Sequence, residues 1–575
     1  MPDTRTLPIA AEHREFAVKA GDRVVSREHQ LVGVTVTAIA NKIASARLVY
    51  VDGAAASGRF PLADSDTFAP GRKVEILAGS GRDATSLFIG KVVRVGLRVR
   101  EGAASQFVVD CRHAAMKLTV AERCADFFDQ TDSDIIGALL DGAGVGKDVE
   151  ATTVSHKQVL QYHATDWDFL LARAAANGQL VWCEGEKVVV RKPALGGASV
   201  CTLNYGATLL EFDGEIDARR QSAIAGTSWD AAGQQTVEVE ATTPSFRPPG
   251  NLTHDALADV AGQTVQLRHA AVPEAEIQAW ADGQALVRQV DQVCGRGKCQ
   301  GIAIVKPGVV VELAGLGQRF NGQAFVTGVR HEFSLVQGWK THVQFGGAEP
   351  EALTPRGRQG VSGLVPAAQG LQIGVVTDIV DPDSEFRIRV RLPMLGLSSD
   401  GVWARVASLD AGDDRGFVFR PEVGDEVTVG FLGDDPRYPV VLGMLHSSAK
   451  PAPIAPDSDN HEKMFKSRSG MTVHFDDDKV VLTLATPAGN QLVLDEDQGS
   501  VTLADQNGNT LTLDSDGVHI ESAGKIEFKA PMDASFEGLN ISLKASAQLS
   551  LEGSASAELK GGGMAKVTGA MVQIN

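Results

Sequence analysis

The sequence predicts a mainly β protein whose C-terminal end is an intertwined, trimeric β-helix, and three observations support this fold class. Residues 518–575 carry pairs of apolar side chains that recur every seven or eight residues. The chain has 61 glycines and only four tyrosines, which fits a β protein rich in turns. Short alternating apolar runs, bounded by turn residues, cover much of the remaining chain. Because 575 residues are too many for one hydrophobic core, we expect roughly three or four domains.

The C-terminal repeat places two apolar residues at positions i and i+2, which face the same side of a short strand. Glycines such as Gly553 and Gly561 turn the chain between these pairs, a pattern typical of a solenoid. One such ribbon is too narrow to bury its own apolar face, whereas three copies around a common axis would bury it and pair every strand edge. The predicted trimer core consists of Val518, Ile520, Ile526, Phe528, Phe536, Ile541, Leu543, Leu549, Leu551, Leu559 and Val567.

The last repeat, GAMVQIN, would form the blunt end of this trimeric needle. Apolar side chains and unpaired strand edges of three chains would meet solvent there, so the end requires a cap. We expect Val572, Ile574 and Asn575 to contact a separate tip protein.

The N-terminal part of the chain is predicted to consist of strands. Turn pairs such as Asp52-Gly53 and Pro70-Gly71 separate the apolar runs. The predicted strands cover residues 32–40, 45–53, 73–79, 86–99 and 105–113.

Helices are predicted at residues 132–145 and near 273–290. Between them, apolar residues at i, i+3, i+4 and i+7 from Trp167 predict a helix that begins at Thr165 or Asp166 and ends at Asn177-Gly178. A hairpin at residues 179–190 follows it. We expect this helix to hold the core of the N-terminal part together through Trp167, Phe169 and Leu170.

Two linkers, at residues 351–370 and 447–465, divide the chain. About five strands between them suit a small closed barrel of the OB type. Arg387, Arg389 and Arg391 alternate along one of these strands and so share a face, for which we expect contacts with another subunit or with the N-terminal domain. The predicted parts are domains at 1–360, 371–446 and 466–575, with a linker at 447–465.

Composition excludes some classes of partner and compartment. The net charge of −18 argues against sequence-independent binding of nucleic acid and against resting attachment to anionic lipid. Six scattered cysteines indicate reduced thiols rather than a disulfide framework, and hence assembly in the cytoplasm. The first residues lack an apolar signal core and no stretch approaches 18 apolar residues, so no signal peptide is predicted.

Motifs that suggest chemistry are explained better as local structure. GAGVGKD (142–148) carries Asp148 where a phosphate-binding loop needs Ser or Thr, and predicts a helix-ending turn. CGRGKC (294–299) lacks the spacing of a redox pair or a zinc site and predicts a turn. His163, Asp166 and Asp168 are explained by a helix cap without a metal ion.

The acidic clusters predict solvated turns rather than an active site. They lie at Asp434-Asp435-Pro436 and at Asp476-Asp477-Asp478. A cell-wall hydrolase would need two carboxylates on a stable cleft, and the linker at 447–465 is too short to fold as one. We therefore predict no enzymatic activity, no catalytic residue, no cofactor and no metal ion.

Three segments, in this order, resemble the VgrG-type spike proteins of contractile injection systems. TDWDFLLARAAANGQLVW (165–182) and the closing segment KPGVVVEL…FVTGVRHEFS (306–334) resemble the hub half of that family. GVVTDIVDPDSEFRIRVRLP (374–393) and RGFVFRPEVGDEVTVGFLGDDPRYPVVLGML (415–445) resemble its OB-fold segment, and the β-helical repeat follows. Within the family, the chain is most similar to spikes of extracellular contractile injection systems, which are related to phage tail hubs.

The resemblance implies a homotrimer with a hub of two β-barrel subdomains and small helical insertions. Such a hub would meet the inner tube protein and baseplate proteins, and the needle would carry a PAAR-like tip protein. The particle would be phage tail-like and would contact a target membrane only when it fires. Two alternatives stay open: a type VI secretion VgrG spike and, from another class, a trimeric receptor-binding fibre or adhesin.

Overall fold

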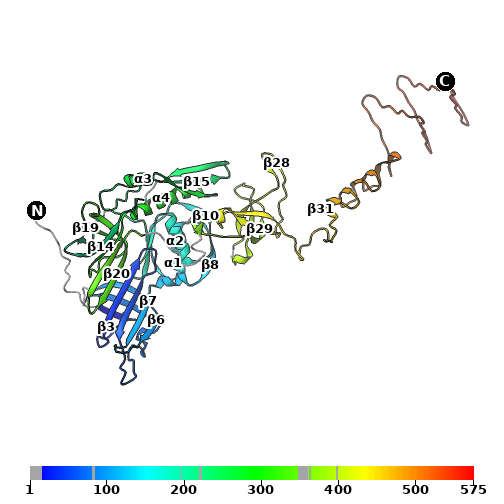
Figure 1. Cartoon of the computed structure of the whole chain (residues 1–575). Coiled ribbons are helices and arrows are strands. Elements are labelled where there is room, and N and C mark those ends of the chain that lie inside the picture. The colour runs from blue at the N-terminus through cyan, green and yellow to red at the C-terminus, as the bar shows by residue number, and fades with distance from the viewer. Residues whose placement is uncertain are drawn as a thin grey trace. The chain divides into compact units, whose positions relative to one another are not determined.

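The computed structural model describes residues 16–79, 84–195, 197–218, 223–347, 360–361, 364–396 and 399–574. The chain divides into two units, residues 1–446 and 447–575 (Figure 1). Most regular structure is strand, so the predicted mainly β fold class is confirmed. In the described part of the chain, every helix is too short or too polar to cross a membrane.

A large mixed sheet forms the framework of the first unit. Its strands run in the order β14-β18-β21-β20-β3-β4-β7-β6-β5-β1-β2, and β13 and β19 branch from β20. The antiparallel pairing of β20 with β3, which sets Gly328 opposite Ile39, joins segments almost 300 residues apart in one sheet. The five strands predicted in the N-terminal part are confirmed as β3 to β7. The bounds are β1 Phe16–Ala20, β2 Arg23–Val24, β3 Leu31–Ile39, β4 Ser45–Val51, β5 Lys73–Ala78, β6 Thr85–Arg98, β7 Gln106–Arg112, β13 Thr202–Asn204, β14 Leu209–Glu215, β18 Cys294–Gln300, β19 Val310–Ala314, β20 Gly322–Ser334 and β21 Gly338–Phe345.

Four α-helices and three smaller sheets pack beside this sheet (Figure 1). The helices are α1 Asp132–Gly142, α2 Asp166–Ala176, α3 His254–Ala261 and α4 Glu274–Val290. The smaller sheets contain β8 Glu122–Thr131 and β10 Ser155–Thr165; β9 Gly146–Val149, β11 Leu180–Glu184 and β12 Lys187–Arg191; and β15 Ala223–Asp230, β16 Gln235–Glu240 and β17 Thr264–His269. Short 3₁₀ turns lie at η1 Asp66–Phe68 and η3 Ala114–Thr119.

Helix α2 shows how local sequence sets these elements. Thr165 is the N-cap, because its hydroxyl accepts a hydrogen bond of 3.1 Å from the Asp168 amide. Asp166 is therefore not the cap, and its carboxylate accepts hydrogen bonds from Arg123 and Gln161 instead. The helix ends at Asn177, and Gly178 follows with a φ of +67°, as predicted.

The barrel of the first unit is closed by five strands, which confirms the predicted barrel. They are β24 Gln372–Asp378, β25 Ile388–Arg391, β26 Val402–Val406, β29 Glu426–Phe431 and β30 Pro439–Met444. Leu160 and Tyr162 of β10 join the apolar cluster of the barrel interior, and Gln372 donates a hydrogen bond of 2.9 Å to the Tyr162 hydroxyl. The remaining short elements are β22 Gly360–Val361, β23 Val365–Pro366, η5 Pro393–Leu395, η6 Leu432–Asp434 and the hairpin β27 Ala411–Gly412 and β28 Arg415–Gly416.

The second unit begins with an antiparallel meander in which consecutive strands pair in order. Its seven strands are β31 Glu462–Lys466, β32 Thr472–Asp476, β33 Val481–Ala485, β34 Gln491–Asp495, β35 Ser500–Ala504, β36 Thr510–Asp514 and β37 Gly517–Glu521. Acidic residues form the turns. The Asp505 carboxylate, for example, accepts the Asn509 and Asn507 amides, which lowers its pKa to about 2. Residues 522–574 carry no helix or strand within a single chain.

Candidate functional site

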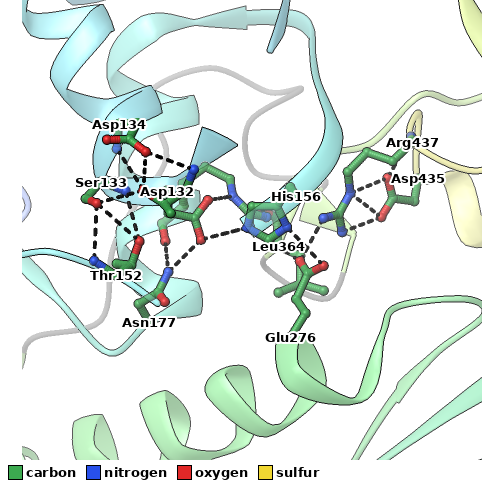
Figure 2. Close-up of polar contacts among 12 residues, drawn as sticks. Asp132, Ser133, Asp134, Thr152, His156, Asn177, Glu276, Leu364, Asp435 and Arg437 are labelled. Atoms are coloured by element: carbon green, nitrogen blue, oxygen red, sulfur yellow. Dashed lines mark hydrogen bonds and ion pairs between the residues drawn. The ribbon is translucent and has the colours of Figure 1, made fainter. Parts of the chain in front are cut away.

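A network of buried charges lies where α1, α2, α4 and β10 meet the loop that precedes β30 (Figure 2). None of its six charged side chains is more than 5% exposed. Buried charges are costly unless they are paired and hydrogen-bonded, so the arrangement of this network matters for stability. Its charged members are Asp132, His156, Arg173, Glu276, Asp435 and Arg437.

One half of the network joins α1 to α2. The Arg173 guanidinium donates to both carboxylate oxygens of Asp132, over 2.6 and 3.0 Å. The Asn177 side chain donates to the same carboxylate over 2.7 Å, and Arg173 also donates to the Leu364 carbonyl over 2.9 Å. A capping box between Thr131 and Asp134 fixes the start of α1 and so holds Asp132 in place.

The other half connects α4 with the barrel. Arg437 Nη1 donates to Glu276 Oε1 over 2.7 Å, across 161 residues of sequence. The same guanidinium pairs with Asp435, over 2.8 Å from Nη2. Arg173 Nη2 reaches the same Glu276 oxygen over 3.3 Å, so Glu276 bridges the two arginines. His269 Nε2 lies 3.0 Å from the Asp435 carboxylate.

His156 completes the charge balance of the network. Its Nε2 lies 3.2 Å from Asp132 and its Nδ1 lies 3.5 Å from Glu276. Burial lowers the pKa of His156, but hydrogen bonds to these two carboxylates outweigh burial and raise it. A protonated His156 with two arginines balances three carboxylates. Burial raises the pKa of Glu276, but Arg437, His156 and Arg173 hold it well below its usual value. In the same way Arg437 and His269 lower the pKa of Asp435 to about 2.

The chemistry of this network is that of a structural joint. Its side chains are sealed from solvent, so a substrate has no access to them. Its ion pairs and the apolar contacts of β10 together fix the barrel against the helices of the first unit. The predicted solvated turn at Asp434-Asp435-Pro436 is therefore wrong for Asp435, which is fully buried.

Sequence reasoning missed this network because its members are scattered from residue 132 to residue 437. One signal was available: Arg173 lies three residues after Leu170, on the apolar side of α2, where a charge requires a buried partner. The partner itself depends on tertiary structure.

The predicted core residues of the N-terminal domain lie on α2. Trp167, Phe169 and Leu170 are fully buried in the largest apolar cluster of the chain. The Phe169 ring stacks on Phe127 of β8 with ring centroids 5.9 Å apart. Helix α2 therefore contributes to the apolar core and, through Arg173, to the ion network.

The predicted trimer-core residues all lie on the surface of a single chain. Val518 and Ile520 belong to β37, and the others follow in the segment without regular structure. Their exposed fractions range from 49% for Ile526 to 82% for Leu559. Of the predicted tip residues, Val572 and Ile574 are exposed, and Asn575 lies outside the described residues. A single chain thus leaves two apolar columns uncovered.

The motifs interpreted as local structure have varied outcomes. GAGVGKD is a helix-ending turn, as predicted: α1 ends at Gly142 and β9 begins at Gly146. CGRGKC is not a turn but the start of β18, although both of its cysteines are free thiols. Within the described residues, no group of His, Cys, Asp and Glu has the geometry of a metal site.

The arginines predicted to contact another subunit or the N-terminal domain have partners within the barrel. Arg387 pairs with Asp381 over 2.8 Å and with Asp383 over 2.7 Å. Arg389 lies 3.4 Å from Asp400. These two charges therefore support the barrel itself.

Three family models match the chain. Residues 10–334 match the Alg8 N-terminal domain, residues 372–446 the type VI secretion system/phage-baseplate injector OB domain, and residues 479–575 the phage baseplate V C-terminal trimerisation domain.

Curated relatives are type VI secretion system spike proteins. VgrG1c of Pseudomonas aeruginosa is 24% identical over 435 residues, which is 69% of this chain and 57% of the relative. VgrG4b of the same organism is 35% identical over 112 residues, which is 18% of this chain and 14% of the relative. The chain thus spans less than two thirds of the length of these relatives.

Solved structures show weaker likeness. An Escherichia coli type VI secretion component, described as similar to the T4 bacteriophage tail proteins gp27 and gp5, has a TM-score of 0.47 at 12% identity and covers 74% of this chain and 99% of its own. The Francisella PdpA–VgrG complex has a TM-score of 0.48 at 8% identity and covers 88% of this chain and 79% of its own. The first family model covers more than half of the chain, and the other two follow it in the order typical of spikes. The chain belongs to the Alg8 N-terminal domain family and is a VgrG-type spike and hub protein.

Proposed function

We propose that three copies of this chain form the central, non-enzymatic spike of a contractile injection machine. The observation that carries the proposal is the pair of apolar columns between Val518 and Val567, which a single chain leaves at least 49% exposed. Large contiguous apolar surface of this kind needs a partner. The columns lie in the segment that matches a trimerisation domain, so the partners are two further copies of the same segment.

The first unit is the end of the spike that joins the inner tube and the baseplate, and the needle carries a PAAR-like tip protein. The named relatives, which are spikes of type VI secretion, support this assignment. When the sheath contracts, the spike punctures the target envelope. Axial force would pass between barrel and hub through the sealed joint of Glu276, Arg437 and Asp435, where neither part can shift without exposing a charge.

The predicted parts fit this role: a hub over residues 1–360, an OB barrel over 371–446, a linker at 447–465 and a needle over 466–575. We infer assembly in the cytoplasm into a phage tail-like particle, released or retained, because the six cysteines are free thiols. The type VI spike is the second candidate, and the names of the curated relatives favour it.

The test is a charge placed inside the predicted trimer axis. In Leu551→Asp, three carboxylates meet at one level of the needle, and each copy loses about 1.5–3 kcal/mol of apolar burial. Leu539→Asp is the matched control, because Leu539 is fully exposed and belongs to neither column. We expect Leu551→Asp to be monomeric and Leu539→Asp trimeric by native mass spectrometry. A normal trimer in Leu551→Asp would show that the columns do not form the axis.

A further inference from the structure

We propose that the large sheet of the first unit continues into a second copy of this chain, with β14 of one copy pairing with the C-terminal half of β6 of the next. The inference rests on the proposed trimer and identifies two of the surfaces that would build it. Both strands are labelled in Figure 1.

One free edge belongs to β6. Strand β5 pairs only with residues 85–91 of β6, and beyond it Val92 exchanges backbone hydrogen bonds with Gly71 and Arg72. From Val93 to Arg98, β6 has β7 on one side and no strand on the other among the described residues. Its unpaired amides and carbonyls form a template for another strand.

The two faces of this half-strand differ in character. Val95 and Leu97 lie opposite Val109 and Phe107, which are buried in the core, yet they stay 38% and 46% exposed. Arg94 and Arg98 lie on the other face, where Arg94 donates to Asp110 over 2.8 Å. The half-strand is thus apolar on the core side, basic on the outer side, and uncovered at its edge.

The second free edge is β14, the terminal strand at the opposite end of the described sheet. Phe212 faces the core, where its ring packs 5.7 Å from Phe320. Glu211, Asp213 and Glu215 alternate with Phe212 and lie on the outer face, and Glu211 pairs with Lys298 of β18 over 2.9 Å. This edge is apolar on the core side and acidic on the outer side.

The two edges complement each other residue by residue. On the outer face, charges already alternate from strand to strand, through Arg47 of β4, Asp110 of β7 and Arg94 of β6. A neighbouring β14 continues the alternation, because its three carboxylates have the same spacing of two residues as the Arg94–Gly96–Arg98 row. On the core face, Phe212 would cover Val95 and Leu97.

The occupant is therefore a second copy of this chain. A pair of β6 edges would instead bring arginines together, and a pair of β14 edges would bring carboxylates together, both of which are destabilising. Two different edges make a head-to-tail contact, and such contacts close into a ring when the rotation permits. Three copies would form one continuous sheet around the axis.

A cysteine pair in the full chain tests the contact. In Gly96→Cys the new Cβ meets no atom within 4 Å, and Asp213→Cys lies at the centre of the acidic edge. After mild oxidation of the double variant, we expect a covalent species of three times the chain mass on a denaturing gel, lost on reduction. Each single variant controls for the six native cysteines. Asp213→Cys with Gly443→Cys, another open glycine, controls for random collision.

The outcomes separate this inference from the proposed function. A trimer by native mass in which the double variant yields no more cross-link than the controls overturns the edge contact and leaves the spike intact. A monomeric parent protein overturns both. As a second test, Arg94→Glu with Arg98→Glu should reduce cross-linking, and adding Glu211→Lys with Glu215→Lys should restore it. No rescue would contradict the charge pairing.

Discussion

Removing the Arg437 guanidinium should destabilise the first unit far more than removing a surface arginine of the same barrel. The change Arg437→Met keeps an unbranched side chain but removes the donors to Glu276 and Asp435, at 2.7 and 2.8 Å. Both carboxylates are at most 4% exposed, so neither gains water as a replacement. Breaking a buried pair in this way costs about 3–5 kcal/mol.

Arg415→Met is the matched control. The Arg415–Asp410 pair has a similar short contact of 2.6 Å, but its side chains are 67% and 46% exposed. Exposed pairs of this kind contribute about 0–1 kcal/mol. Urea unfolding, followed by tryptophan fluorescence, gives the free energy of unfolding of both variants. Equal losses of less than about 1 kcal/mol would refute the view that burial makes the network a rigid joint.

A double-mutant cycle isolates the contact between α4 and the barrel. Glu276→Gln and Arg437→Met should each be costly alone, whereas the double variant should cost less than their sum, because neither charge is then left without its partner. Strict additivity would mean that the barrel and α4 are not coupled through this pair.

Three further predictions concern the first unit. The folded-state pKa of His156 is raised, so its stabilising effect is complete below the ordinary value of 6.5 and is lost as pH rises through the raised value; unfolding free energies of the parent and His156→Gln should converge as pH rises, and a constant gap would contradict this. Trp167→Ala, at a fully buried side chain, should cost about 3–5 kcal/mol in the same urea assay, and a loss below 1 kcal/mol would contradict its place in the core. Gly283→Ala would bring a methyl group within 2.6 Å of the Gly178 backbone and should lower the melting temperature, whereas Gly443→Ala, in open space, should not.

Much of the fold follows from local sequence. The strands at 32–40 and 45–53, the cap at Thr165 and the five-stranded barrel depend on alternation, capping and turn chemistry, which act between near neighbours. The error at Cys294 has the same origin, since glycines in CGRGKC suggest a turn, but pairing with β14 and β21 makes it a strand. Tertiary pairing overrode local preference there.

The ion network could not be predicted from the sequence. Asp435 was assigned to a solvated turn because Asp-Asp-Pro is a turn signal, and burial depends on Glu276 and Arg437 arriving from distant segments. The apolar columns, in contrast, are visible in sequence because a repeat carries its own periodicity. Their burial needs chains other than the one described.

The mass of the purified full chain in solution tests the central claim most directly. Native mass spectrometry or light scattering should give three times the chain mass of 60.7 kDa, and negative-stain images of that species should show a bulky head with a thin needle. A compact monomer of 60.7 kDa would contradict the account, because the apolar columns would then have no partner chains to cover them.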